Sequence, residues 1–267
     1  MIRMLATDLD GTLVDEQGRI AEEDVQALRR ARAMGVLVIV ATGRMPTTIE
    51  HFLNRLEVTD HEPIVGGQGA MVARINGEIL HTLTIPRQVA EEGAAIAREM
   101  GAIPVFYTTH GIFMERVAFS PEEDAYWLGH GLRYEPQALS TVEDDFVKIL
   151  AVQPDASKAE ALLHAFQNKL GHAAEVVRSH HWFVEAVNKH ATKGAAIAWI
   201  AKQVGIKQHE IVAIGDAGND ISMLRWAGLS AAPADAAPEA LAAAKWIAPP
   251  QKQHAVAATL AHFLFDQ

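Results

Sequence analysis

The sequence of 267 residues contains no cysteine, which excludes disulfide bonds, thiol nucleophiles and cysteine-ligated metal centres. It also lacks an apolar run long enough to span a bilayer, and its first residues show no signal-peptide pattern. Basic residues are few, with 23 Lys and Arg against 33 Asp and Glu, and a formal net charge of −10 argues against non-specific nucleic-acid binding. We therefore expect a cytoplasmic protein, a monomer or homodimer, that binds neither nucleic acid nor membrane.

Apolar residues are plentiful, at 49% of the chain, and they form short runs that alternate with helical patterns. Residues 2–7, 36–42 and 62–67 are predicted strands, with predicted helices at 21–34 and 46–56 between them. The run VLVIVAT is apolar throughout, which is typical of a strand buried on both faces of a parallel sheet. The alternation predicts an α/β fold with a doubly wound, Rossmann-like parallel sheet.

The middle of the chain has a different character, because strands and helices there follow an α+β pattern. The first pattern resumes later, with a predicted strand at 210–216 and an alanine-rich packing segment at 231–244. We therefore expect a discontinuous core domain of residues 1–84 and 189–267. A second, α+β domain is expected as an insertion at 85–188.

Asp8 and Asp10 stand one residue apart at the end of the first predicted strand, in the stretch LATDLDGTLVDE. Side chains at i and i+2 of a strand point the same way, so these carboxylates repel unless a proton or cation accompanies them. Either the pair belongs to an ordinary solvated turn, or a positive group belongs there.

Three more polar clusters follow strands or open a helix: Thr42-Gly43-Arg44, Lys193-Gly194 and Gly215 to Asp220. Ligands bind beyond the C-terminal ends of parallel strands, so the clusters are expected at one sheet edge.

The four clusters, in the order DLDGT, a Thr after the second strand, a Lys opening a helix and GDAGND, resemble the motifs of the haloacid dehalogenase (HAD) superfamily of phosphohydrolases. Any one of them could be a turn, but four in this order are a specific signal. The inserted domain resembles the α/β cap of the Cof-type, sugar-phosphatase-like branch. The resemblance implies a Mg²⁺-dependent phosphomonoesterase that acts on small phosphorylated metabolites, sugar phosphates foremost, through an aspartyl-phosphate.

The resemblance also implies roles for single residues. Asp8 would be the nucleophile, and Asp10 the general acid and base. Mg²⁺ would be held by the Asp8 carboxylate, the Asp10 backbone carbonyl and the Asp216 carboxylate, while Asp220 would fix metal-bound water. Phosphate or substrate contacts are expected from Leu9, Thr42, Gly43, Arg44, Lys193 and Asn219. The alternatives are a solvated helix start for the lysine and a surface ion pair for the arginine.

Three positions depart from the usual family pattern. Gln68 stands where Asn is common, Asp235 where an Asn-Ala pair is usual, and HAVA at 254–257 where Asp-Gly-Val-Ala is usual. None of them lies in the four motifs, so they bear on substrate preference more than on hydrolysis.

Two other interpretations of the function compete: a phosphomutase of the same fold, and a non-enzymatic phosphate-sensing module. Receiver modules, however, are much shorter and lack a capping insertion.

The segment SHHWFVEAVN, just before the second domain boundary, is the candidate substrate surface of the inserted domain. His181, Glu185 and Asn188 could contact a sugar there. Trp182 and Phe183 could either stack on a substrate or fill the core. The alternative for the whole segment is a central strand that only packs.

Overall fold

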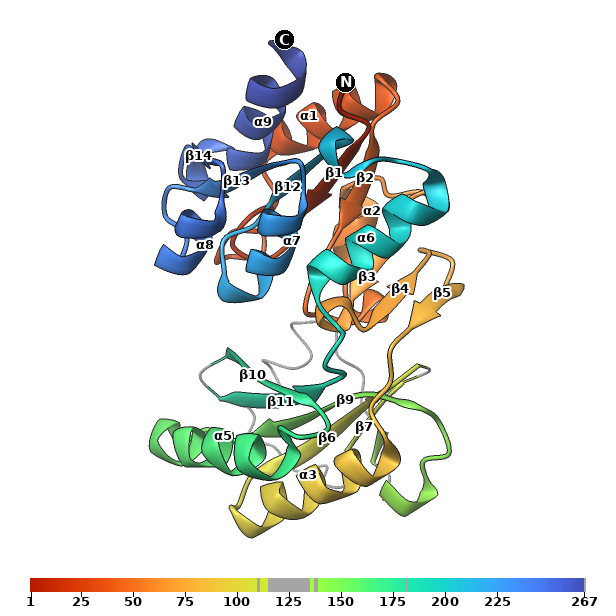
Figure 1. Ribbon diagram of the computed structural model, residues 1–267, viewed down its shortest axis with the longest axis vertical. Helices are drawn as coiled ribbons and strands as arrows, with labels where there is room; N and C mark the ends of the chain where they lie inside the picture. Colours follow the sequence, from red (N-terminus) through yellow and green to blue (C-terminus); the bar gives the residue numbers. More distant parts are fainter. Residues whose placement is uncertain (110, 115–134, 137–138, 181, 267) are drawn as a thin grey trace. The chain divides into compact units, whose positions relative to one another are not determined.

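The computed structural model describes residues 1–109, 111–114, 135–136, 139–180 and 182–266 (Figure 1). The chain divides into two compact units, each described here by itself: Met1–His81 with Thr192–Gln267, and Thr82–Ala191. The boundaries expected from the sequence, after residues 84 and 188, fall inside the second unit.

A five-stranded parallel sheet forms the centre of the first unit, in the order β14-β13-β12-β1-β2. Its strands are β1 (Met4–Thr7), β2 (Leu37–Val40), β12 (Ile211–Ile214), β13 (Leu229–Pro233) and β14 (Trp246–Ala248). The central strand β1 pairs with β2 on one side and with β12 on the other, and all its residues are buried. This is the parallel sheet that the alternating pattern predicts.

Helices cover both faces of this sheet (Figure 1). One set packs on one face: α1 (Glu22–Ala33), α2 (Glu50–Arg55) and α9 (Ala255–Leu260). The other set packs on the opposite face: α6 (Lys193–Val204), α7 (Ile221–Trp226) and α8 (Pro238–Ala243). Along β1, Leu5 belongs to the first core, and Met4 and Ala6 to the second. Two buried faces explain why the strands are apolar throughout.

Helix α6 begins at Lys193, the lysine that the sequence expects to open a helix, and both ends carry local signals. The Thr192 side chain accepts a hydrogen bond from the Ala195 amide at 3.1 Å, which caps the N-terminus. Gly205 ends the helix in the left-handed conformation, with φ of 67°. The cap places Lys193 in the first helical position.

Strand β13 lies in the segment where the sequence predicts only packing by small residues. Its sequence, LSAAP, has little strand propensity, yet it pairs with β12 and β14. Ala231 and Ala232 are fully buried there. Position inside the sheet decides the conformation, since small side chains suit a strand with helices close on both faces.

A small three-stranded sheet continues the first unit next to β2, in the order β3 (Ile64–Gly66), β4 (Met71–Ala73) and β5 (Ile79–Thr82). A parallel bridge between Ala41 and Val65 attaches β3 beside the end of β2. A hairpin turn at Asn76-Gly77 connects β4 to β5, with φ of 89° at the glycine. The turn of residues 67–69 is thereby brought next to residues 42–44.

The second unit contains a six-stranded sheet in the order β10-β11-β9-β6-β7-β8, antiparallel except for the β7–β8 pair. Its strands are β6 (Ile103–Thr108), β7 (Ile112–Met114), β8 (Glu135–Pro136), β9 (Phe146–Val152), β10 (Glu175–His180) and β11 (Phe183–Val187). Helices α3 (Arg87–Glu99) and α5 (Ala156–Leu170) pack against the sheet through a shared apolar core (Figure 1). The helix expected near 121–132 lies outside the described residues.

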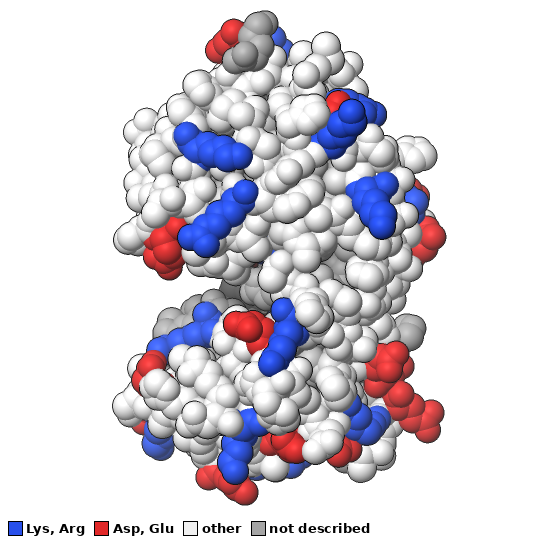
Figure 2. All heavy atoms as spheres, in the orientation of Figure 1, with Lys and Arg blue, Asp and Glu red and all other residues white. Residues whose placement is uncertain are grey.

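The surface offers no strong charge pattern on the face drawn in Figure 2, where Lys and Arg side chains are scattered among neutral residues. Among the described residues, every helix is too short or too polar to cross a membrane.

Candidate active site

Asp8 and Asp216 reach the same edge of the parallel sheet because each follows one of two neighbouring strands. Strand β1 ends at Thr7, and the Asp8 amide donates to the Ile214 carbonyl at 2.9 Å, which ties it to the end of β12. Asp216 comes two residues after that strand. Asp220 closes the short turn that follows, before α7. The predicted convergence at the C-terminal strand ends is therefore what the structure has.

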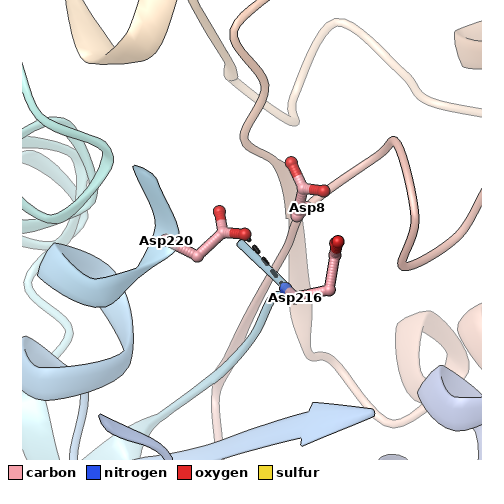
Figure 3. Close-up of side chains that lie close together, drawn as sticks. All are labelled: Asp8, Asp216 and Asp220. Atoms are coloured by element: carbon pink, nitrogen blue, oxygen red, sulfur yellow. Dashed lines mark hydrogen bonds between the residues drawn. The ribbon is translucent and has the colours of Figure 1, made fainter. Parts of the chain in front are cut away.

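The three carboxylates form a cluster in which one oxygen of each lies within 4.8 Å of the others. Figure 3 shows Asp8, Asp216 and Asp220 turned toward one another. The Thr12 hydroxyl donates to Asp216 Oδ1 at 2.7 Å. Asp220 Oδ2 accepts from the amides of Asp216 and Ala217, both at 3.0 Å. The Asp216 and Asp220 carboxylates are thus held in place by contacts from a neighbouring loop and from their own loop.

Lys193 supplies the positive group at this cluster. Its Nζ donates to Asp8 Oδ1 at 2.5 Å and to Asp220 Oδ1 at 2.6 Å, and the whole side chain is buried. Because Lys193 is the first residue of α6, the N-terminal amides of that helix add partial positive charge nearby. The solvated helix start, which the sequence left open for this lysine, does not occur.

The charges at the cluster do not balance, since one ammonium faces three carboxylates. Burial raises the pKa of Asp8 well above its ordinary value, with a further increase from Asp220, and Lys193 only partly opposes it. Burial also raises the pKa of Asp216. Burial alone would lower the pKa of Lys193, but the Asp220 and Asp8 carboxylates outweigh it and raise that pKa. Excess negative charge on hard oxygen ligands fits a divalent cation.

Gly11 is required at this site for steric reasons. Its φ is 85°, a conformation that side chains rarely adopt. A Cβ atom there would lie 2.5 Å from Asp216 Oδ2. A larger residue would therefore push the Asp216 carboxylate out of the cluster.

Asp10 does not join the carboxylate cluster. Its side chain is 44% exposed and forms a two-pronged ion pair with Arg44, with Nε to Oδ2 at 2.9 Å and Nη2 to Oδ1 at 2.6 Å. The sequence assigned Arg44 to phosphate or sugar, with a surface ion pair as the alternative. In this structure the ion pair is present, and its partner is Asp10.

Two of the other predicted site residues, Thr42 and Leu9, differ in which of their groups could contact a ligand. Thr42 is buried, and its Oγ1 accepts from the Arg44 amide at 3.1 Å, which leaves the hydroxyl proton outside that bond. The Leu9 side chain belongs to the hydrophobic core, and its carbonyl accepts from the amides of Leu13 and Val14. Any contact from Leu9 to a ligand would therefore come from its backbone, because its side chain is part of the core.

Gln68, which the sequence marks only as a departure from the family pattern, contacts one of the predicted site residues. Its Oε1 accepts from Asn219 Nδ2 at 2.9 Å. The glycines on either side of it in GGQGA indicate an unusual turn. The other two departures lie in local turns: Asp235 accepts from the Gln251 amide at 2.9 Å, and His254 is the N-cap of α9, with φ of 62°.

The candidate substrate surface of the second unit is held by polar contacts. Glu185 is buried, and its Oε2 lies 2.7 Å from Lys148 Nζ. Asn188 Nδ2 donates to the Thr84 carbonyl at 2.7 Å. His181 lies outside the described residues. Glu185 therefore forms a buried ion pair on the sheet.

Residues 5–260 match the family described as haloacid dehalogenase-like hydrolase. The chain belongs to this family. YxeH of Bacillus subtilis (strain 168) is 28% identical to this HAD-like hydrolase over 270 residues, which is 96% of each chain. The HMP-PP phosphatase of Escherichia fergusonii is 26% identical over 224 residues, 84% of this chain and 81% of its own. A solved HAD subclass IIB sugar phosphatase superposes with a TM-score of 0.83 at 26% identity, covering 98% of both chains.

The expected superfamily, the α/β fold class and the expectation of an enzyme are confirmed by this match. A non-enzymatic phosphate-sensing module is set aside, because the family is one of hydrolases.

Proposed function

We propose that this HAD-like hydrolase cleaves phosphate monoesters of small metabolites, sugar phosphates foremost, with Asp8 as the nucleophile. The observation that carries the proposal is the buried Asp8 carboxylate, fixed by Lys193 at 2.5 Å and flanked by two more carboxylates. A carboxylate held in this way can form a covalent bond to phosphorus. Two of the similar proteins are named as phosphatases, one of them a sugar phosphatase, which supports the substrate class.

Mg²⁺ is the proposed metal ion. The donor set fits it, since Mg²⁺ prefers hard oxygen ligands and the cluster carries excess negative charge. The Asp8 and Asp216 carboxylates and the Asp10 carbonyl would hold it, with Asp220 beside them. When bound, it would offset the negative charge of Asp8 and of the phosphate, two anions that must approach each other.

The first chemical step joins Asp8 to phosphorus. Lys193 holds the Asp8 carboxylate in one orientation, so an oxygen of Asp8 can attack in line while the bond from phosphorus to the leaving oxygen breaks. The Lys193 ammonium, the Thr42 hydroxyl and the N-terminal amides of α6 would offset charge on the phosphoryl oxygens. The product of this step is an aspartyl-phosphate and an alcohol.

Asp10 is proposed to move the protons. It would give a proton to the leaving oxygen, and then take one from the water that attacks phosphorus and restores Asp8. Arg44 donates to both carboxylate oxygens of Asp10, so Arg44 must turn away before Asp10 can reach the leaving oxygen. A substrate phosphate or sugar oxygen is an alternative acceptor for that guanidinium.

The test is a screen of the purified protein against a panel of phosphorylated metabolites, with phosphate release measured in EDTA and again after Mg²⁺ is added. The proposal predicts release from sugar phosphates that requires Mg²⁺. Conversion to an isomeric sugar phosphate without net release would indicate the phosphomutase instead. A chain that acts on no phosphate ester under either condition would contradict the proposal.

A further inference from the structure

The turn Gly67-Gln68-Gly69, which connects β3 to β4, has an uncommon backbone. Its three residues have φ of 57°, 62° and 97°, all in the left-handed region. Glycine adopts these angles readily, but for glutamine they are unfavourable. A strained residue persists where its surroundings hold it, and the contacts of this turn hold Gln68.

The backbone of this turn is attached to the loop after β2. The Gly67 amide donates to the Arg44 carbonyl at 2.9 Å, and the Gln68 amide donates to the Thr42 carbonyl at 3.3 Å. The turn therefore supports the loop from which Thr42 and Arg44 reach the site.

The turn also abuts the start of α6. A Cβ atom at Gly69 would lie 2.2 Å from the Thr192 carbonyl oxygen, directly before Lys193. The same three residues thus touch two of the loops that build the proposed phosphate site.

The Gln68 side chain connects a third loop. It is 9% exposed, whereas Asn219, its hydrogen-bond partner at 2.9 Å, is exposed. Gln68 Nε2 lies 2.3 Å from the position that a Cβ at Gly43 would take, so the amide passes over the glycine. A buried side chain therefore spans from Gly43 to an exposed asparagine.

We propose that Gln68 is a positioning residue that orients the Asn219 amide toward the substrate phosphate, an inference that rests on the proposed function. One N–H of Asn219 is engaged by Gln68, which fixes the plane of the amide and the direction of its second N–H. Gln68 acts through Asn219 and does not itself touch the phosphate. Holding an exposed side chain in its binding orientation removes an ordering cost from substrate binding.

The main variant is Gln68→Asn, which shortens the side chain by one methylene and tolerates the left-handed backbone better. The contact to Asn219 is lost while the fold is kept. We expect KM for 4-nitrophenyl phosphate and the dissociation constant of inorganic phosphate to rise about 3- to 10-fold, the usual effect of one hydrogen bond. The value of kcat and the melting temperature should stay close to those of the wild type.

A double-mutant cycle separates positioning from general support. Gln68→Ala, Asn219→Ala and the double variant are compared by calorimetric titration with inorganic phosphate in the presence of Mg²⁺. If Gln68 acts through Asn219, Gln68→Ala causes no further loss in the Asn219→Ala background. Gln208→Asn is the matched control, because this exposed glutamine precedes β12 at the other end of the sheet. The phosphate affinity of the Gln208→Asn protein should equal that of the wild type.

Additive losses in the cycle, or an unchanged phosphate affinity in Gln68→Asn, would overturn the positioning role and leave the proposed function intact. A wild-type protein that neither binds inorganic phosphate nor releases it from an ester would overturn the proposed function, and this inference with it.

Discussion

Lys193 offsets the negative charge of the site, since its ammonium group lies between the buried carboxylates of Asp8 and Asp220. We predict that Lys193→Met abolishes turnover and lowers the free energy of unfolding in EDTA by about 3–5 kcal/mol, because Asp8 and Asp220 lose their buried partner. Added Mg²⁺ should recover part of that loss. Urea unfolding with and without Mg²⁺ measures both effects.

The control for this prediction is Lys202→Met, an exposed lysine on the same helix. It should unfold like the wild type. A Lys193→Met protein as stable as this control would show that the buried ion pairs contribute little.

Metal binding can be tested at a single carboxylate without measuring turnover. The three carboxylates are the proposed cation site, and a cation that binds only the folded state raises the melting temperature. We therefore predict that Mg²⁺ raises the melting temperature of the wild type, and that Asp216→Asn removes most of this shift. Glu16→Gln, at an exposed position, should keep it. An equal shift in Asp216→Asn would place the metal elsewhere.

At the scale of elements, α1 and α9 are joined by a buried carboxylate. Asp24 of α1 is fully buried, and its Oδ1 accepts from the Ala257 amide of α9 at 2.8 Å. Burial raises the pKa of Asp24 from its ordinary value of 3.8 to about 6. Between about pH 4 and pH 6, Asp24 is therefore protonated in the folded state and ionised in the unfolded state.

The sign of the pH dependence follows from this raised pKa. The contribution of Asp24 to stability is fully present below about pH 4, falls as the pH rises, and is lost above about pH 6. Relative to Asp24→Asn, which can still accept from Ala257, the wild type should lose about 2–3 kcal/mol of unfolding free energy between pH 4 and 7. Urea titrations of both proteins across this range measure it, and parallel profiles would contradict it.

The sequence predicts those elements whose structural signals are local, and it does not predict those that depend on contacts distant in sequence. The start of helix α6 at Lys193 is predicted, and the structure shows local end signals at Thr192 and Gly205. Strand β13 is not, since only its position between β12 and β14 makes LSAAP a strand. The pairs Asp10–Arg44 and Gln68–Asn219 join loops that are distant in sequence, so no local pattern could indicate them. The motif order predicts Asp8, Asp216 and Lys193 together because parallel strands end at one edge.

At the scale of the whole molecule, the second unit is the proposed source of substrate discrimination. Glu185 is an unsuitable probe of substrate contact, because Glu185→Ala would also break its buried ion pair with Lys148. We predict that it lowers the free energy of unfolding by about 3–5 kcal/mol and impairs all substrates alike. Thermal unfolding, with kcat/KM on two substrates, measures this.

His181→Ala and Asn188→Ala remain the variants that test contact with the substrate. They should raise KM for the metabolite found by the screen and leave 4-nitrophenyl phosphate hydrolysis almost unchanged. Equal losses on both substrates would mean that this segment supports folding and does not select the substrate.

The central claim is that Asp8 attacks phosphorus, and peptide mass spectrometry of the enzyme, acid-quenched during turnover, tests it most directly. The account predicts a phosphoryl group on Asp8 in the wild type. With 4-nitrophenyl phosphate, whose leaving group needs no proton from Asp10, it also predicts accumulation of that species in Asp10→Asn, where loss of the proton shuttle slows hydrolysis of the aspartyl-phosphate by about 10²–10⁴-fold. Asp8→Asn should carry no phosphoryl group and show no turnover. Turnover of Asp8→Asn at the wild-type rate, or a phosphoryl group on another residue, would contradict the account.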